Sequence, residues 1–192
     1  MTSLVLASSS RYRRELLGRL GIRFESWAPD VDERPLSAET PLQTAQRLAR
    51  AKAEAAAKRW PAAWIIGSDQ VADLDGAALG KPGTRENARA QLRALSGRTA
   101  RFHTALCLFH GERARRHESV VTTEVAFRDL APAEIERYLE REDALDCAGS
   151  AKSEGLGISL LARLGGDDPT ALVGLPLIAL CAMLRAEGFE VP

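Results

Sequence analysis

Lysine is scarce in this chain: only four of the 26 basic side chains among its 192 residues are lysines, and the others are arginines. The 26 acidic side chains balance them to a formal net charge of zero. Proteins that bind nucleic-acid backbones carry an excess of positive charge, so a nucleic-acid partner is not expected. Hydrophobic residues make up an ordinary 45%, and the length suits one domain, which we expect to span residues 1–192.

Cysteine and long apolar runs are also scarce. Cys107, Cys147 and Cys181 are odd in number and widely spaced, which excludes a disulfide framework and a paired-cysteine metal site. No run approaches the roughly 18 apolar residues of a membrane span, and the first residues lack the basic flank and long apolar core of a secretion signal. We therefore expect a cytoplasmic protein that does not contact a membrane.

Apolar periodicity predicts strands alternating with helices, followed by a pair of long antiparallel strands. The predicted strands cover residues 4–7, 22–27, 64–67, 71–74, 77–79, 99–109 and 119–128. The predicted helices cover residues 11–20, 40–59, 84–95, 132–142 and 176–187. The expected fold is therefore α/β: a mixed, partly antiparallel twisted sheet flanked by helices, a pattern that permits two lobes.

Hydroxyl side chains and an arginine stand where the first predicted strand meets the first predicted helix. Ser8, Ser9 and Ser10 precede the helix, whose first backbone N–H groups lack partners and favour an anion. Arg13 heads the inward stripe of this helix, although a cation in the first turn opposes the helix dipole. A bound phosphate would explain that arginine, and a structural ion pair is the alternative.

Lysine and acidic residues form a second group of candidates. Lys52 falls in the alanine-rich apolar stripe of the second predicted helix, where it either faces a ligand or extends to solvent. Asp69 follows the apolar strand 64–67, and the carboxyl ends of such strands are where open α/β sheets bind ligands. Asp32 and Glu33 lie in a loop. Carboxylates that face a phosphate are suited to a divalent cation such as Mg²⁺.

Two later segments complete the candidates. Lys81 lies in Gly80-Lys81-Pro82, where it is a flexible cation able to reach a phosphate. The small, glycine-rich stretch 147–157 carries Lys152 and Glu154, and it is able to form a pocket wall close to a ligand.

Taken together, these motifs resemble the Maf family of nucleoside triphosphate pyrophosphatases over nearly the whole chain. The segments that match the family pattern are Leu6-Ala7-Ser8-Ser9-Ser10, Arg13-Arg14-Glu15-Leu16-Leu17, Asp32-Glu33, Ala51-Lys52-Ala53, Gly67-Ser68-Asp69, Gly80-Lys81-Pro82 and Gly155-Leu156-Gly157. The stretches 65–71, 147–155 and 174–181 resemble the YceF-like branch, which is associated with 7-methyl-GTP.

This resemblance implies an inosine-triphosphatase-like fold with two lobes around a cleft, and one catalytic domain that often forms a homodimer. It implies hydrolysis of a nucleoside triphosphate between the α- and β-phosphates with Mg²⁺ or Mn²⁺. The implied catalytic residues are Asp69, Glu33, Lys52 and Lys81, of which Glu33 and Asp69 hold the metal. Ser8, Ser10 and Arg13 are the implied phosphate-binding residues, and Lys152 and Asp32 are secondary candidates.

The resemblance also places substrate selection at Tyr12, Gln70 and Glu154. An aromatic face and a carboxylate both complement the positive charge of 7-methylguanine. The branch usually has tryptophan at the position of Tyr12, so stacking on the base is expected to be weaker here. The expected products are 7-methyl-GMP and pyrophosphate. The alternatives are a dTTP/UTP pyrophosphatase of the sister branch and a non-catalytic nucleotide-binding regulator of cell division.

Overall fold

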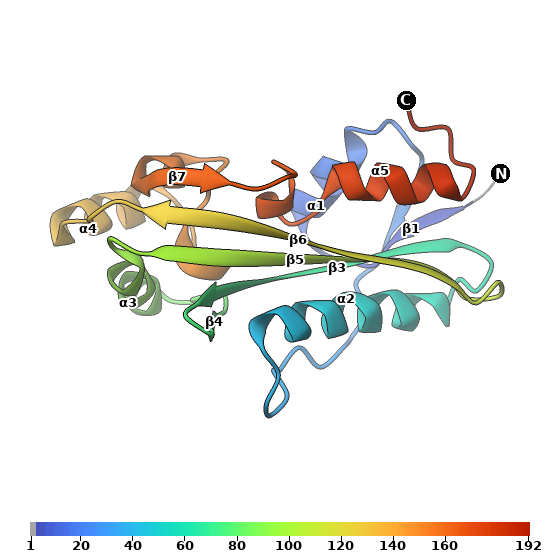
Figure 1. Cartoon of the computed structure of the whole chain (residues 1–192), viewed down its shortest axis with the longest axis horizontal. Coiled ribbons are helices and arrows are strands. Elements are labelled where there is room, and N and C mark those ends of the chain that lie inside the picture. Colours follow the sequence, from blue (N-terminus) through green and yellow to red (C-terminus); the bar gives the residue numbers. More distant parts are fainter. Residues whose placement is uncertain (1–2) are drawn as a thin grey trace.

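The computed structural model describes residues 3–192, so the first two residues of the predicted domain lie outside the described part. It contains a seven-stranded sheet and five α-helices (Figure 1). The strands are β1 (Leu4–Leu6), β2 (Glu25–Ser26), β3 (Trp64–Leu74), β4 (Ala77–Leu79), β5 (Thr99–His110), β6 (Arg115–Phe127) and β7 (Leu161–Gly165). The helices are α1 (Arg11–Gly18), α2 (Pro41–Ala57), α3 (Arg85–Leu95), α4 (Pro132–Arg141) and α5 (Leu177–Ala186), with short 3₁₀ turns η1 (Ala148–Ser150), η2 (Leu156–Leu160) and η3 (Ala171–Val173).

The sheet is mixed, as predicted. Its strand order is β2-β1-β3-β5-β6-β7, and β4 pairs with β3 as a hairpin. β2, β1 and β3 run parallel, whereas β5, β6 and β7 are each antiparallel to the strand before them in this order. The prediction of a partly antiparallel α/β sheet is therefore confirmed.

The central strand β3 is longer than the sequence pattern predicts. Residues 68–70, expected to follow a short strand, lie inside β3, because β5 pairs with it from Trp64 to Asp73. β1 stops pairing at Ile66, so Asp69 lies in mid-strand, just past the point where the parallel neighbour ends. The expectation that Asp69 closes a strand was wrong, although it does follow the end of the parallel pairing.

Two other strands also differ from expectation. The predicted strand 22–27 is reduced to the two-residue β2, and β7 was not predicted at all. The side chains of β7 are mostly exposed, so no alternation of apolar and polar residues marks it as a strand.

Two lobes form at opposite ends of the long strands, as Figure 1 shows. In the first lobe, α1 and α5 pack on the face of the sheet that carries Leu4 and Leu6, whereas α2 packs on the opposite face, which carries Val5. In the second lobe, α3 and α4 pack around Phe102 and Phe127. Among residues 3–192, no helix has both the length and the apolarity needed to cross a lipid bilayer.

The contact between α2 and β3 is unusually close. Ala45, Ala49, Ala53 and Ala56, all at most 1% exposed, face the sheet, and a Cβ placed on Gly67 would lie 2.1 Å from the carbonyl oxygen of Ala49. Only small side chains allow a helix to approach a strand this closely. The alanine stripe therefore holds the next turn of α2, which carries Lys52, against the middle of β3.

The loop 28–40 is tied to α2 by an ion pair. Glu39 accepts hydrogen bonds from Nε of Arg47 at 2.6 Å and from the backbone N–H of Leu36 at 3.0 Å. Arg47 also donates to the carbonyl oxygen of Arg34 at 3.0 Å. The hydrogen bond from Arg47, followed by that from Leu36, lowers the pKa of Glu39 from 4.5 to about 2.

This pair predicts an acid-dependent loss of stability. Because the pKa of Glu39 is lower in the folded chain, its contribution is complete above pH 4.5 and is lost as the pH falls toward about 2. We expect Glu39→Gln to be less stable than the parent at pH 7, with the difference shrinking by pH 3. Urea unfolding at both pH values measures this, and an equal difference at both would show that the pair does not contribute.

Candidate active site

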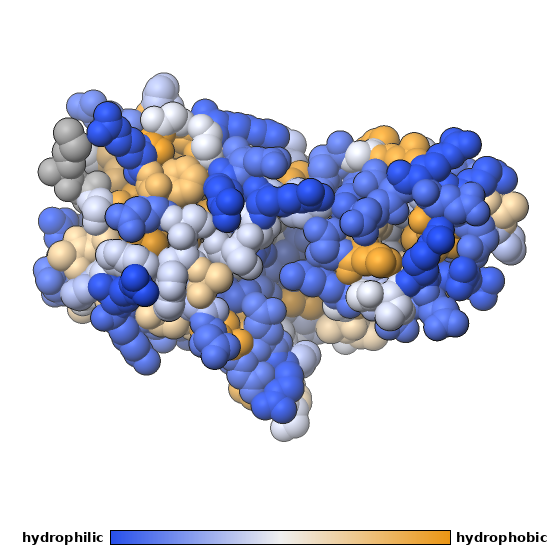
Figure 2. Space-filling view, turned by 180° about the vertical axis from the view of Figure 1, so that it is seen from behind, coloured by the Kyte–Doolittle hydropathy of each residue, from blue (hydrophilic) through white to orange (hydrophobic). Residues whose placement is uncertain are grey.

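A deep cleft lies where the two lobes meet, and the surface is visibly hollowed there (Figure 2). Its volume is about 880 Å³, within the size range of small-molecule sites. The walls come from the β1–α1 turn, the loop before α2, the middle of β3, the loop after β4, and the segments 146–154 and 172–174. Every catalytic and phosphate-binding residue expected from the sequence lines it: Ser8, Ser10, Arg13, Glu33, Lys52, Asp69 and Lys81.

The β1–α1 turn forms one end of the cleft. Ser10 caps α1 by accepting a hydrogen bond from the backbone N–H of Arg13, at 3.4 Å. The hydroxyl of Ser8 accepts from the backbone N–H of Ser10 at 3.1 Å and from Nη1 of Arg13 at 3.4 Å. The helix N-terminus, two hydroxyls and a guanidinium therefore converge, an arrangement suited to an anion.

Arg13 is held by the backbone of a distant segment. Its Nε donates to the carbonyl oxygen of Gly174 at 2.8 Å. Gly174 has a φ of 116°, which other residues rarely adopt. Burial lowers the pKa of Arg13, while the carboxylates of Asp69 and Glu33 act to raise it. Arg13 is thus a cation fixed in the cleft wall with much of its water removed, so a phosphate there would meet a preformed positive charge.

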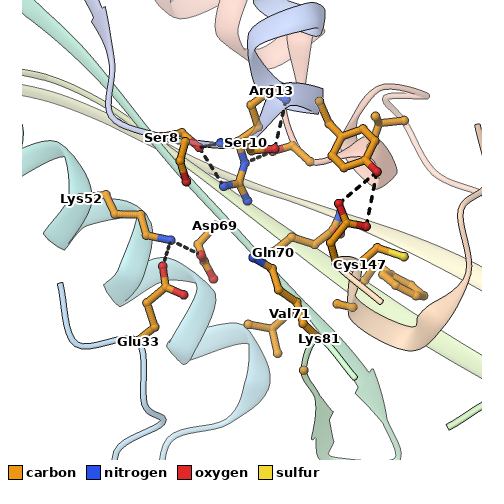
Figure 3. Close-up of a pocket in the computed structure, with 18 of the residues that line it drawn as sticks. Ser8, Ser10, Arg13, Glu33, Lys52, Asp69, Gln70, Val71, Lys81 and Cys147 are labelled. Atoms are coloured by element: carbon orange, nitrogen blue, oxygen red, sulfur yellow. Dashed lines mark hydrogen bonds and ion pairs between the residues drawn. The ribbon is translucent and has the colours of Figure 1, made fainter. Parts of the chain in front are cut away.

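Lys52 lies between two carboxylates of the cleft, Asp69 and Glu33 (Figure 3). Its ammonium lies 2.6 Å from Oδ1 of Asp69 and 2.6 Å from Oε1 of Glu33. The side chains of Lys52 and Asp69 are only 8% and 11% exposed, whereas that of Glu33 is 57% exposed. Of the two possibilities for Lys52, the inward orientation is the observed one, and the side chain does not extend to solvent.

Glu33 is held as a carboxylate by its neighbours. Burial acts to raise the pKa of Glu33. The net effect is a pKa below the usual value, because Glu33 accepts a hydrogen bond from Lys52 and lies near the positive charges of Lys52, Lys81 and Arg13. Glu33 is therefore ionised at neutral pH. Lys81 is exposed on the loop after β4, so it is free to move toward a bound anion.

The carboxylates of Glu33 and Asp69 are suited to bind a hard divalent cation that also binds phosphate. Glu33 and Asp69 converge on one positive charge, the ammonium of Lys52, so both already present oxygens to a shared cation. Within residues 3–192, no group of three or more His, Cys, Asp or Glu side chains is arranged to hold a metal. Mg²⁺ is commonly bound by one or two carboxylates, waters and substrate phosphates rather than by an all-protein cage. The residues fit that mode.

The specificity candidates Tyr12, Gln70 and Glu154 all line the cleft. The amide nitrogen of Gln70 donates to the carbonyl oxygens of Ala171 and Leu172, each at 2.9 Å. Gln70 therefore holds η3 as part of the wall.

The two secondary candidates do not line the cleft. Asp32 forms an exposed ion pair with Arg34 at 2.6 Å, which lowers the pKa of Asp32 to about 2. Lys152 is buried behind the wall, where its ammonium lies 3.4 Å from Oδ1 of Asp146. Asp146 does line the cleft and was not identified from the sequence, although it directly precedes the glycine-rich segment that was.

Comparisons with known proteins identify the family of this chain. A family model described as "Maf-like protein" matches residues 3–187. A protein of Xanthomonas oryzae pv. oryzae (strain MAFF 311018), named 7-methyl-GTP pyrophosphatase, is 61% identical over the full length of both chains. Proteins of the same name from Cupriavidus pinatubonensis and Burkholderia pseudomallei are 58% and 57% identical, over 97% and 98% of this chain and 94% and 89% of their own. This chain therefore belongs to the Maf family.

Proposed function

We propose that this protein is a nucleoside triphosphate pyrophosphatase that hydrolyses 7-methyl-GTP to 7-methyl-GMP and pyrophosphate. The observation that carries the proposal is a buried lysine shared by two carboxylates, Lys52 with Asp69 and Glu33, beside a preformed anion site at the start of α1. The names of the full-length relatives support the choice of substrate.

The carboxylate of Asp69 is the proposed general base. One of its oxygens is held by Lys52, and the side chain lines the cleft, so the carboxylate can accept a proton from a water molecule beside the substrate. That water attacks the α-phosphorus, the bond to the bridging oxygen breaks, and pyrophosphate leaves. Lys52 fixes the orientation of Asp69 and Glu33 together.

The cationic groups hold the triphosphate and offset the charge that develops on it. In this proposal Ser8, Ser10 and Arg13 take phosphate oxygens at the helix start, and the exposed Lys81 adds a cation from the loop after β4. Such preorganised donors stabilise developing negative charge without having to reorganise during the reaction. A Mg²⁺ or Mn²⁺ ion held by Glu33 and Asp69 would neutralise phosphate charge and polarise the phosphorus–oxygen bonds.

A substrate panel tests this proposal. Pyrophosphate release from 7-methyl-GTP, GTP, dTTP and UTP is measured at equal concentrations, with Mg²⁺, with Mn²⁺ and with excess EDTA. We expect the highest kcat/KM with 7-methyl-GTP, and loss of turnover in EDTA. Preference for dTTP or UTP would identify the sister-branch activity instead. No pyrophosphate from any triphosphate would favour a non-catalytic nucleotide-binding regulator.

A further inference from the structure

Asp146 is a carboxylate of the cleft that contacts Tyr12, one of the residues expected to select the base. Both oxygens of its carboxylate accept a hydrogen bond from the hydroxyl of Tyr12, at 3.3 and 3.4 Å. Lys152, buried behind the wall, lies 3.4 Å from Oδ1 of Asp146. The side chain of Asp146 is still 51% exposed and lines the cleft, so two anchors hold it while it remains open to a ligand.

The face of the Tyr12 ring is already occupied by positive charge. The guanidinium carbon of Arg11 lies 4.7 Å from the ring centroid, and the ammonium of Lys152 lies 5.8 Å from it. A ring that already interacts with two cations has less attraction left for a third. The ring alone therefore does not explain a preference for a positively charged base. The attraction must come from a carboxylate near the ring, and Asp146 is in contact with it.

Lys152 does not cancel the charge of Asp146. Its ammonium also donates to the carbonyl oxygen of Asp143 and lies 3.7 Å from the carboxylate of Glu142, so one ammonium is shared by two carboxylates. Glu154 is a further carboxylate that lines the cleft. Of the four carboxylates among the described residues that line it, Glu33 and Asp69 are paired with Lys52, so Asp146 and Glu154 are the two that lie outside that cluster.

We propose that Asp146 is a specificity-determining residue, held by Tyr12 and Lys152, whose charge favours a cationic 7-methylated purine over a neutral one. The inference rests on the proposed function and deepens it, because it assigns discrimination to charge and not only to shape. It also gives the tyrosine hydroxyl a task, because this hydroxyl donates to the carboxylate proposed to face the base.

The test separates charge from shape with two methylated substrates. The base of 7-methyl-GTP is positively charged. The base of 7-methyl-7-deaza-GTP has the same shape and methyl group but is neutral. We measure kcat/KM for both, and for GTP, with the parent protein, Asp146→Asn, Tyr12→Phe and the control Glu140→Gln. Glu140 is an exposed carboxylate at the end of α4 that does not line the cleft, so its variant carries the same change in net charge.

In Asp146→Asn we expect the ratio of kcat/KM for 7-methyl-GTP over its neutral analogue to fall about five- to tenfold, with turnover of GTP nearly unchanged. Tyr12→Phe should lower the ratio less, because Lys152 still holds Asp146. In the parent protein the ratio should shrink as salt is added, since salt screens charges at a half-exposed site. Glu140→Gln should leave the ratio as it is.

A ratio unchanged in Asp146→Asn would overturn this inference while leaving the proposed function standing. An equal loss on all three substrates would also overturn it, because that pattern indicates a structural role. If the parent protein hydrolyses none of the methylated substrates, the proposed function itself fails. If Asp146→Asn is inactive, calorimetry gives the same comparison: the ratio of the Kd values for 7-methyl-GMP and GMP is measured for the variant and for the parent protein.

Discussion

Replacing Asp69 with asparagine is expected to lower kcat for triphosphate hydrolysis by about 10²–10⁴-fold, the usual effect of removing a general base. Asparagine keeps the size of the side chain and an oxygen able to accept from Lys52, so the contact between α2 and β3 should persist. It cannot take a proton from water. The fall should therefore appear in kcat more than in KM, and the melting temperature should change little.

Asp73→Asn is the matched control for this variant. Asp73 lies four residues further along β3, so it has the same strand orientation, but it contacts His103 and does not line the cleft. Its kcat should stay close to that of the parent. If Asp69→Asn retains full turnover, Asp69 is not the base; if both variants lose turnover equally, the loss reflects the strand and not the site.

Gly67→Ala is expected to have the largest effect on stability, about 3 kcal/mol or more. The new methyl group would lie 2.1 Å from the carbonyl oxygen of Ala49 and 2.8 Å from the backbone nitrogen of Ala53. Both atoms belong to the backbone of α2, so no side chain can rotate away and the helix itself must shift. Since α2 carries Lys52, activity should fall as well.

Thermal unfolding measures this effect, and Gly18→Ala is the control. For a domain of this size, about 3 kcal/mol corresponds to a fall in Tm of roughly 6–12 °C. Gly18 ends α1, and no neighbouring part of the chain comes within 4 Å of the place that a Cβ would take there, so its replacement should be neutral or slightly stabilising. An unchanged Tm for Gly67→Ala would mean that α2 does not pack as closely as the structure shows.

Local patterns made part of this site predictable. The periodicity of α2 placed Lys52 on a buried face, and the structure confirms that it points inward. The serines and the inward Arg13 at the start of α1 indicated an anion site because a helix N-terminus has unpaired donors whatever its surroundings. Each of these inferences used residues within a few positions of one another.

Long-range pairing decided the rest. Asp69 lies in mid-strand because β5 pairs along the whole of β3, and no local pattern in residues 64–74 shows this. Asp146 and Tyr12 are in contact but lie 134 positions apart in the sequence, so no local pattern indicates that they interact. The place of Lys152 behind the wall likewise depends on how the segment after α4 folds back over Tyr138, whose hydroxyl accepts from the backbone N–H of Lys152.

Hydrolysis of 7-methyl-GTP in ¹⁸O-labelled water tests the central claim most directly. Attack on the α-phosphorus places the label in 7-methyl-GMP and releases unlabelled pyrophosphate, which mass spectrometry of both products detects. That is the result we predict, and it should disappear in Asp69→Asn. Label found in pyrophosphate, or release of 7-methyl-GDP with inorganic phosphate, would contradict the proposed reaction.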